Sequence, residues 1–277
     1  MRDLLTIAHL TLHETVRRRV LLAALIGGAA FLVLFAVGMH FVNLDAVKSD
    51  ASAMERRIMF SILTLAGLFA ASRLVMMTAV LLPVDTLSGE IASGVIQTVA
   101  SKPIRRRDIV LGKWLGHWLV MAGYLVLLTG GVLLIIRVIA HQSPPRLERG
   151  LPLMLLEGTV LLTLSIAGGT RLSTITNGMF AFGLYGIAFI GNWVEQIGTF
   201  TDNEAARYVG TVASLIMPSE AMWQLAAAHM QPTLMRELGA TPFSPLSVPS
   251  AAMVWWSLGY VVVALAIGLR IFQKRPL

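Results

Sequence analysis

The chain has 277 residues, of which 56% are hydrophobic and only 13% are charged, and this is too little polar surface to cover a soluble globule of that size. The net charge of the chain is +7. In a membrane protein an excess of Lys and Arg usually lies in cytoplasmic loops, so we expect no nucleic-acid partner. The absence of cysteine excludes disulfides and thiolate chemistry. The sequence therefore predicts an all-α integral membrane protein that contacts membrane lipid.

Residues 1–19 are predicted to form an amphipathic helix. Apolar side chains recur on one helical face and polar side chains lie mostly elsewhere, which is typical of a helix in the membrane interface. His9, His13 and Glu14 have a spacing that could hold a metal ion. Because no further ligand lies nearby, we interpret them as an interfacial polar face and expect no metal site.

Six apolar stretches are close to or above the roughly 20 residues that cross a bilayer as a helix. They are Val20 to Val42, Ile58 to Leu82, Leu115 to Ala140, Leu151 to Gly169, Gly178 to Val194 and Ala251 to Ile271. Only a few polar residues around Arg171 separate the fourth stretch from the fifth. These two form either a helical hairpin, which gives six spans, or a broken span with a re-entrant piece, which gives fewer.

Arg73 lies within the second predicted span, about 15 Å from its inner end and about 22 Å from its outer end. An arginine near the centre of a membrane helix costs about 2.5–3.5 kcal/mol, so we expect its side chain to face protein or water. Glu157 is the acidic candidate, but a depth difference of about 13 Å argues against a direct ion pair. Either these residues belong to a substrate path, or Arg73 ties helices together inside the bundle.

The stretch DTLSGEIASGVIQTVASKPIRRRDIVLGK, from Asp85 to Lys113, is the longest polar interruption in the first half of the chain. It lies in a predicted cytoplasmic loop, residues 83–114. The stretch begins with acidic, glycine and serine residues, continues with a short amphipathic segment, and ends with basic residues. A charged, helix-capable loop between two spans indicates a docking element.

Residues 195–250 form the longest region that does not span, and we expect it on the outer, extracytoplasmic side. Tyr208 to Met217 and Ala221 to Met230 are rich in apolar residues but too short to cross, and the Pro-Ser-Glu sequence between them indicates a helix start. We predict short helices that re-enter the membrane or lie on its outer face.

The basic residues predict the orientation of the chain. With the N-terminus inside, 13 of the 22 Lys and Arg lie on the inner side, 8 lie on the outer side, and Arg73 lies within a span. Because Lys and Arg are enriched in cytoplasmic loops, we expect a multi-pass protein of the cytoplasmic membrane with both termini cytoplasmic.

No catalytic pattern is evident. Gly112 and Lys113 superficially resemble the end of a Walker A loop, but Trp114 replaces Ser/Thr and Arg107 occupies the position of the first Gly. Neither HExxH nor a nucleophile elbow is present. We expect no enzymatic activity and no cofactor on this chain.

The central stretch resembles that of permease subunits of ABC transporters of the ABC-2 (type-2 exporter) family. That family has an acidic start followed by Gly, a Lys/Ser-Pro turn, an Arg and a closing Gly-Lys. The matching positions are Glu90, Gly94, Lys102, Pro103, Arg106, Gly112 and Lys113. The layout of the whole chain is also similar, whereas Arg105 departs from the small polar residue usual at its position.

The resemblance implies a single transmembrane permease domain, residues 1–277, that exports a substrate across the cytoplasmic membrane. It implies a homodimer with a second permease copy and two copies of a separate ABC ATPase subunit, which binds ATP and Mg²⁺. In that family the polar loop holds a coupling helix that sits in a groove of the ATPase. The ATPase-coupling residues predicted from this resemblance are Glu90, Gly94, Pro103, Arg105, Arg106, Gly112 and Lys113.

An alternative function keeps this architecture without transport. Some relatives pass ATPase motion to an extracytoplasmic partner in metal-cofactor maturation, as mechanical transmitters. A polar path containing Arg73 would favour transport, whereas a dry dimer interface with a partner on the outer segment would favour transmission. A third possibility, an intramembrane enzyme, requires a catalytic dyad that the sequence does not show.

Overall fold

The structure, a computed structural model, describes residues 2–49, 52–94, 104–232, 245 and 247–275. Within these residues all regular elements are helices. Six of them are long and apolar enough to cross a membrane: α2 (Arg19–Lys48), α3 (Ala53–Leu81), α6 (Arg106–Ala140), α7 (Leu147–Gly169), α8 (Thr174–Phe200) and α12 (Ala252–Lys274). The predicted all-α class with six spans is confirmed.

The fourth and fifth predicted spans are separate helices. α7 ends at Gly169 and α8 begins at Thr174, after Ser173, whose side chain accepts a hydrogen bond from the Thr176 backbone N–H. An N-cap of this kind satisfies a backbone donor that the first turn leaves without a helical partner. The polar residues around Arg171 are therefore the turn of a helical hairpin rather than a break within one span.

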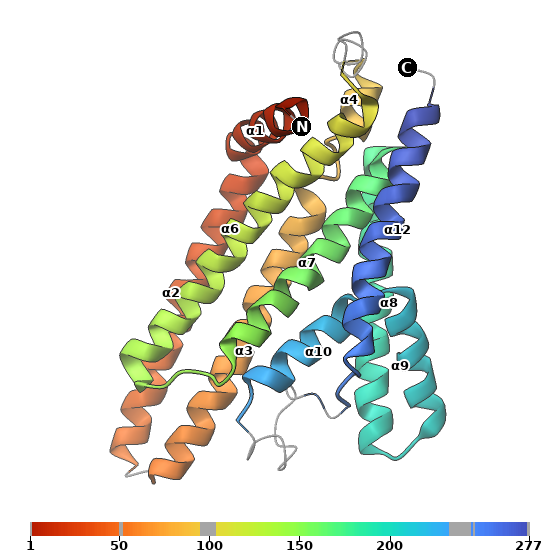
Figure 1. Ribbon diagram of the computed structural model, residues 1–277. Coiled ribbons are helices and arrows are strands. Elements are labelled where there is room, and N and C mark those ends of the chain that lie inside the picture. The colour runs from red at the N-terminus through yellow and green to blue at the C-terminus, as the bar shows by residue number, and fades with distance from the viewer. Residues whose placement is uncertain (1, 50–51, 95–103, 233–244, 246, 276–277) are drawn as a thin grey trace.

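Four shorter helices complete the described part of the chain: α1 (Arg2–Val16), α4 (Ser88–Ala92), α9 (Glu204–Ile216) and α10 (Ser219–Met230). Both chain ends, α1 and α4 lie at one end of the bundle, and the α2/α3 and α6/α7 connections lie at the other (Figure 1). α9 packs along α8, and α10 packs mainly against α7. The two short helices expected between the fifth and sixth spans are therefore present.

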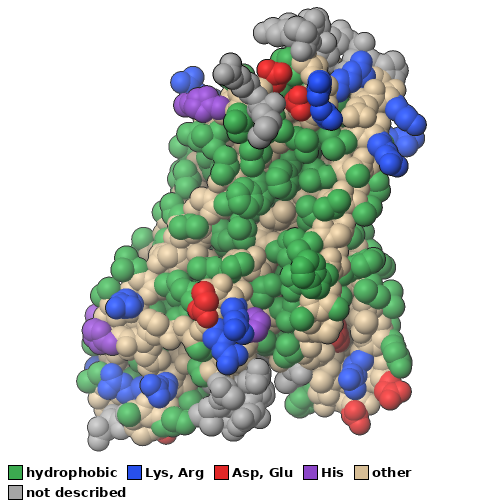
Figure 2. All heavy atoms as spheres, in the orientation of Figure 1, with side chains coloured by type: hydrophobic (Ala, Val, Ile, Leu, Met, Phe, Trp, Pro, Cys, Tyr) green, Lys and Arg blue, Asp and Glu red, His purple; other side chains and the backbone are tan. Residues whose placement is uncertain are grey.

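The core lies between α3, α6 and α7, and α7 is the most deeply buried of the candidate spans. Leu68, Val75, Leu128 and Leu161 are completely buried there. By contrast, α2 and α12 present large apolar side chains outward. Figure 2 shows hydrophobic side chains across the middle of the face in view, with the charged side chains gathered towards its two ends. This is the surface expected of a protein whose middle lies in lipid.

Candidate functional site

Arg73 lies inside the bundle, where it pairs with two acidic side chains. Its Nη2 lies 2.8 Å from Oε1 of Glu157, and its Nη1 pairs with Oε1 of Glu220. Both glutamates are completely buried, and the Arg73 side chain is only 15% exposed. Nη1 also donates to the Tyr185 hydroxyl, 2.5 Å away. We call Arg73, Glu157, Tyr185 and Glu220 the core ion cluster.

The predicted lack of contact between Arg73 and Glu157 is wrong. Arg73 lies 8 residues before the end of α3 at Leu81, and Glu157 lies 12 residues before the end of α7 at Gly169. Measured from these ends, the depths differ by about 6 Å at 1.5 Å per residue, which a long side chain bridges. Counting from the outer ends failed because these ends are not level: Arg73 lies 20 residues after the start of α3 at Ala53, whereas Glu157 lies only 10 residues after the start of α7 at Leu147.

Secondary contacts orient the two carboxylates. Ser72 Oγ donates to Glu157 Oε2 at 2.7 Å, and Asn192 Nδ2 donates to Glu220 Oε2 at 3.4 Å. The guanidinium of Arg73 also lies 4.7 Å from the centroid of the Phe69 ring and 5.8 Å from that of Trp223. As expected, Arg73 faces protein, and its contacts join α3, α7, α8 and α10.

Little free space adjoins the core ion cluster. A cavity beside the cluster, between α3, α8 and α10, is bordered by Phe69, Asn192, Trp223 and Gln224 and has room for about one water molecule at most. In this conformation the cluster acts as a tie between four helices. Its membership of a substrate path stays a prediction.

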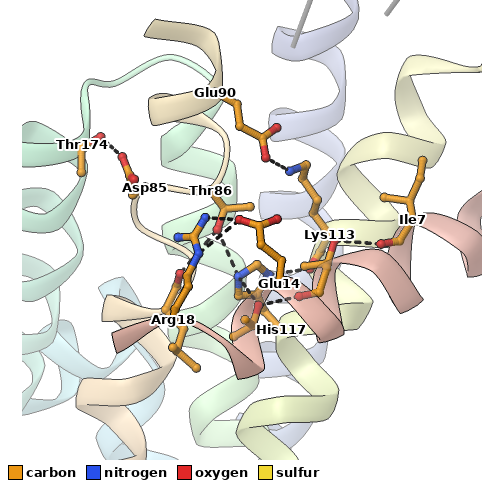
Figure 3. A network of polar contacts seen from close by, with 12 residues as sticks. Ile7, Glu14, Arg18, Asp85, Thr86, Glu90, Lys113, His117 and Thr174 are labelled. Atoms are coloured by element: carbon orange, nitrogen blue, oxygen red, sulfur yellow. Dashed lines mark hydrogen bonds and ion pairs between the residues drawn. The ribbon is translucent and has the colours of Figure 1, made fainter. Parts of the chain in front are cut away.

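The second polar network lies at the end of the molecule that holds the termini. We call this region, made of α1, α4 and residues 106–117 of α6, the terminal platform (Figure 3). Lys113 on α6 forms an ion pair with Glu90 on α4, with side-chain exposures of 8% and 18%. Two of the residues predicted from the family pattern are therefore brought together, and the contact fastens α4 to the start of the third span.

His117 joins three segments of the terminal platform. Its Nδ1 donates to the Lys113 carbonyl at 2.8 Å, since a carbonyl can only accept, which leaves Nε2 as an acceptor. The hydroxyl of Thr86 lies 3.0 Å from Nε2, and that of Thr15 lies 3.5 Å away. The ring therefore links α6 to α1 and to the turn before α4.

Two glycines of α6 let α1 approach closely. A Cβ at Gly112 would lie 2.7 Å from Cβ of Ile7, and one at Gly116 would lie 2.8 Å from the carbonyl oxygen of Ala8. Both distances are too short for ordinary contact, so a side chain at either position would push α1 away. Gly112, which the family pattern selected, is therefore a packing position.

The remaining predicted coupling residues have different surroundings. Nη1 of Arg106 donates to the carbonyl of Arg275 at 2.6 Å, which ties α6 to the end of α12. Gly94, just after α4, has φ of +75° with open space around it, a conformation that favours glycine. Arg105 is exposed, and Pro103 lies outside the described residues.

Glu14 and Arg18 form an ion pair on the exposed edge of the terminal platform, with Oε1 and Nη2 2.5 Å apart. Burial raises the pKa of the Glu14 carboxyl, but the hydrogen bond and charge of Arg18 more than offset this, so the pKa lies below its ordinary value. The described residues contain no group of three or more His, Asp or Glu side chains that could hold a metal ion.

Sequence reasoning missed two members of the core ion cluster. Glu220 follows Pro218 at a predicted helix start, so its position pointed only to an acidic first turn. Tyr185 lies in an apolar run with nothing to mark it. Charged residues within membrane spans are usually paired. A search for the partner of Arg73 among all acidic residues, including those outside the predicted spans, could therefore have selected Glu220.

Comparison with protein families decides the identity. A family model described as ABC-2 family transporter protein matches residues 5–277, nearly the whole chain. The chain belongs to the ABC-2 transporter family. It is thus a permease subunit of an ABC transporter and a multi-pass membrane protein, and permeases of this family work with an ATPase carried on a separate subunit. A search of curated proteins found no match.

Proposed function

We propose that this ABC-2 permease exports its substrate from the cytoplasm, driven by ATP hydrolysis on a separate subunit docked at the terminal platform. In this proposal both termini are cytoplasmic, and two permease copies pair as a homodimer above two ATPase copies. ATP and Mg²⁺ bind to the ATPase. The observation that carries the proposal is the terminal platform, a small polar assembly tied to the ends of the spans.

Charge supports the orientation. Both triple-arginine runs, residues 17–19 and 105–107, lie at the end of the molecule with the termini. Basic residues of membrane proteins gather on the cytoplasmic side. α1 also leaves Leu5, Leu10 and Val16 exposed, as an interfacial helix would when its apolar side chains rest in lipid.

The contacts of the platform suit force transmission. α4 is fixed to α6 by Glu90 and Lys113, and Thr86, just before α4, contacts His117. A partner that moves α4 by a few ångström therefore moves α3 and α6 as well, because packed helices shift as rigid bodies. Arg105 and Arg107 are exposed and are assigned to contact acidic side chains of the ATPase, which gives orientation and partner choice.

The experiment that tests this function is purification of the tagged permease from its native membrane, with ATP hydrolysis assayed with and without the chain. We expect a stoichiometric ATPase whose activity depends on the permease. Recovery of the chain without a nucleotide-dependent partner would contradict the proposal. An outer protein that co-purifies, with no substrate crossing the membrane, would favour mechanical transmission instead.

Orientation can be measured separately because the chain has no cysteine. Ser93, just after α4, and Ser143, between α6 and α7, are both exposed. A membrane-impermeant maleimide added to intact cells or right-side-out vesicles should label the Ser143→Cys variant. The Ser93→Cys variant should react only after permeabilisation, and the reverse pattern would overturn the orientation.

A further inference from the structure

A large cavity in the described part of the chain lies at the end opposite the terminal platform. It is a hollow of about 640 Å³, within the range of about 300–1,000 Å³ typical of small-molecule sites. Its walls come from the start of α3, the α6/α7 connection, and the end of α10 with the residues that follow. None of the residues that line it is a member of the core ion cluster, although α10 contributes residues to both.

The titratable side chains that line this cavity are arginines and histidines. Arg57, His141, Arg146 and His229 contribute to its lining, and no Asp or Glu of the described residues does. Neither Arg57 nor Arg146 forms an ion pair with an acidic side chain in the described ranges. Figure 2 shows basic and histidine side chains, with some acidic ones, at this end of the molecule. Two arginines are thus available to a negatively charged ligand.

The backbone that presents these side chains is held in an unusual conformation. His141 has φ of 53° and Arg146 has φ of 48°, and both line the cavity. The left-handed region costs a residue with a side chain about 1–2 kcal/mol. Such conformations persist where the surrounding structure fixes them and are common at ligand sites. Here they turn the α6/α7 connection around the cavity.

We infer that this cavity is a binding site for an anion that carries a phosphate or carboxylate group, bound by Arg57 and Arg146 on the extracytoplasmic side. Guanidinium groups match the planar or tetrahedral oxygens of these anions with paired hydrogen bonds. Ser61, Gln142 and Ser143 also line the cavity and can donate hydrogen bonds to neighbouring hydroxyl or ester oxygens of the ligand. The ligand is therefore a polar anion rather than an acyl chain.

The site deepens the proposed function, on which it rests only for its outward orientation. His229 lies at the end of α10, and Glu220 at the start of the same helix pairs with Arg73 in the core. An anion in the cavity therefore touches a helix that is anchored among the spans. This position suits an acidic exported substrate as it leaves, or the phosphate of an outer-leaflet lipid.

The test measures anion binding by the purified permease in nanodiscs made with uncharged, zwitterionic phosphatidylcholine. Inorganic phosphate is titrated by calorimetry at low salt, and parallel samples contain phosphatidylglycerol, with the thermal midpoint as readout. The test variant is Arg57→Gln together with Arg146→Gln. The matched control is Arg149→Gln, which removes an exposed arginine one turn away that does not line the cavity.

We expect the double variant to weaken binding at least 10-fold, because each lost charged hydrogen bond alone accounts for about that factor. The control should bind as the wild type does. Phosphate binding lost in the double variant indicates a soluble anion, whereas a phosphatidylglycerol effect lost in it indicates a lipid headgroup. The single variants, each with a smaller loss, replace the double variant if it does not fold.

Equal binding by the double variant and the control would overturn the inference, as would no response of the wild type to either anion. This failure is distinguishable from failure of the proposed function. ATPase association is measured on unmodified membranes and does not depend on the cavity. If the Ser143→Cys variant were labelled only after permeabilisation, the anion site could still exist, but it would not face outward.

Discussion

The core ion cluster and the terminal platform use similar side chains in different surroundings. In the core, Arg73 faces two glutamates that are completely buried. In the platform, Lys113 and Glu90 retain some exposure, and Glu14 and Arg18 are substantially exposed. Breaking a buried pair by removing one partner costs about 3–5 kcal/mol, whereas an exposed pair contributes about 0–1 kcal/mol. Burial therefore decides which network holds the bundle together.

The difference suits the two tasks that we assign. Helices that must stay together while the bundle tilts need a tie that is costly to break. A surface that meets a partner needs groups that can exchange contacts at low cost. We expect the terminal platform to owe its rigidity mainly to packing of α1 against α6, because Gly112 and Gly116 allow these helices to approach closely.

The largest effect is expected from Arg73→Met, which leaves Glu157 and Glu220 buried without a cation. We expect a loss of about 3–5 kcal/mol in unfolding free energy, measured by equilibrium unfolding in mixed micelles. Arg207→Met, at an exposed position of α9, is the control and should change stability by less than about 0.5 kcal/mol. If Arg73→Met were as stable as the wild type, the buried ion cluster would not stabilise the bundle more than the exposed pairs of the platform do.

The next effect tests whether packing holds the platform. Gly116→Ala places a methyl group against the backbone of α1, and overpacking of this kind costs about 1–3 kcal/mol. Gly123→Ala, on the same helix with open space around it, should instead stabilise the protein by up to about 1 kcal/mol, through helix propensity. Permease-dependent ATP hydrolysis should fall only in Gly116→Ala. Equal behaviour of the two variants would show that α1 does not need its close approach.

A smaller effect is expected for the ion pair between Glu90 and Lys113. A double-mutant cycle with Glu90→Gln and Lys113→Met should give a coupling energy of about 1 kcal/mol, at the upper end for pairs with some exposure. The loss of ATPase coupling should exceed this loss of stability, because the pair fastens α4 to α6. A coupling energy above about 3 kcal/mol would place this pair with the buried ones instead.

The smallest effect concerns Glu14. Because its pKa is lowered in the folded protein, its contribution is present above the ordinary glutamate pKa and is lost as the pH falls through the folded value. For an i,i+4 pair this amounts to about 0.3–0.5 kcal/mol. Unfolding of the wild type and of Glu14→Gln is compared at neutral pH and at a pH of about 2, well below the ordinary glutamate pKa, and the two should differ by that amount only at neutral pH. A constant difference would mean that the pair with Arg18 contributes nothing.

Sequence reasoning predicted the six spans because length and apolar composition are local properties. It placed their ends less well, since helices continue through polar residues such as those from Arg106 onward. Residue counts from the outer ends separated Arg73 from Glu157, although the two side chains meet, because α3 and α7 do not begin at the same depth. The family pattern selected Glu90 and Lys113, but that they pair with each other follows only from how α4 folds back on α6.

The sequence by itself determined that the chain is an all-α membrane protein. A content of 56% hydrophobic residues leaves too little polar surface for a soluble globule, and continuous apolar stretches of about 20 residues cross lipid as helices, which satisfy their own backbone hydrogen bonds. It also required that Arg73 face protein, because a lone charge in lipid is costly. Only the tertiary structure decided which residues neutralise that charge and which arginines remain available around the cavity. Those choices depend on the return of α10 against α7, a contact between distant segments that no local pattern encodes.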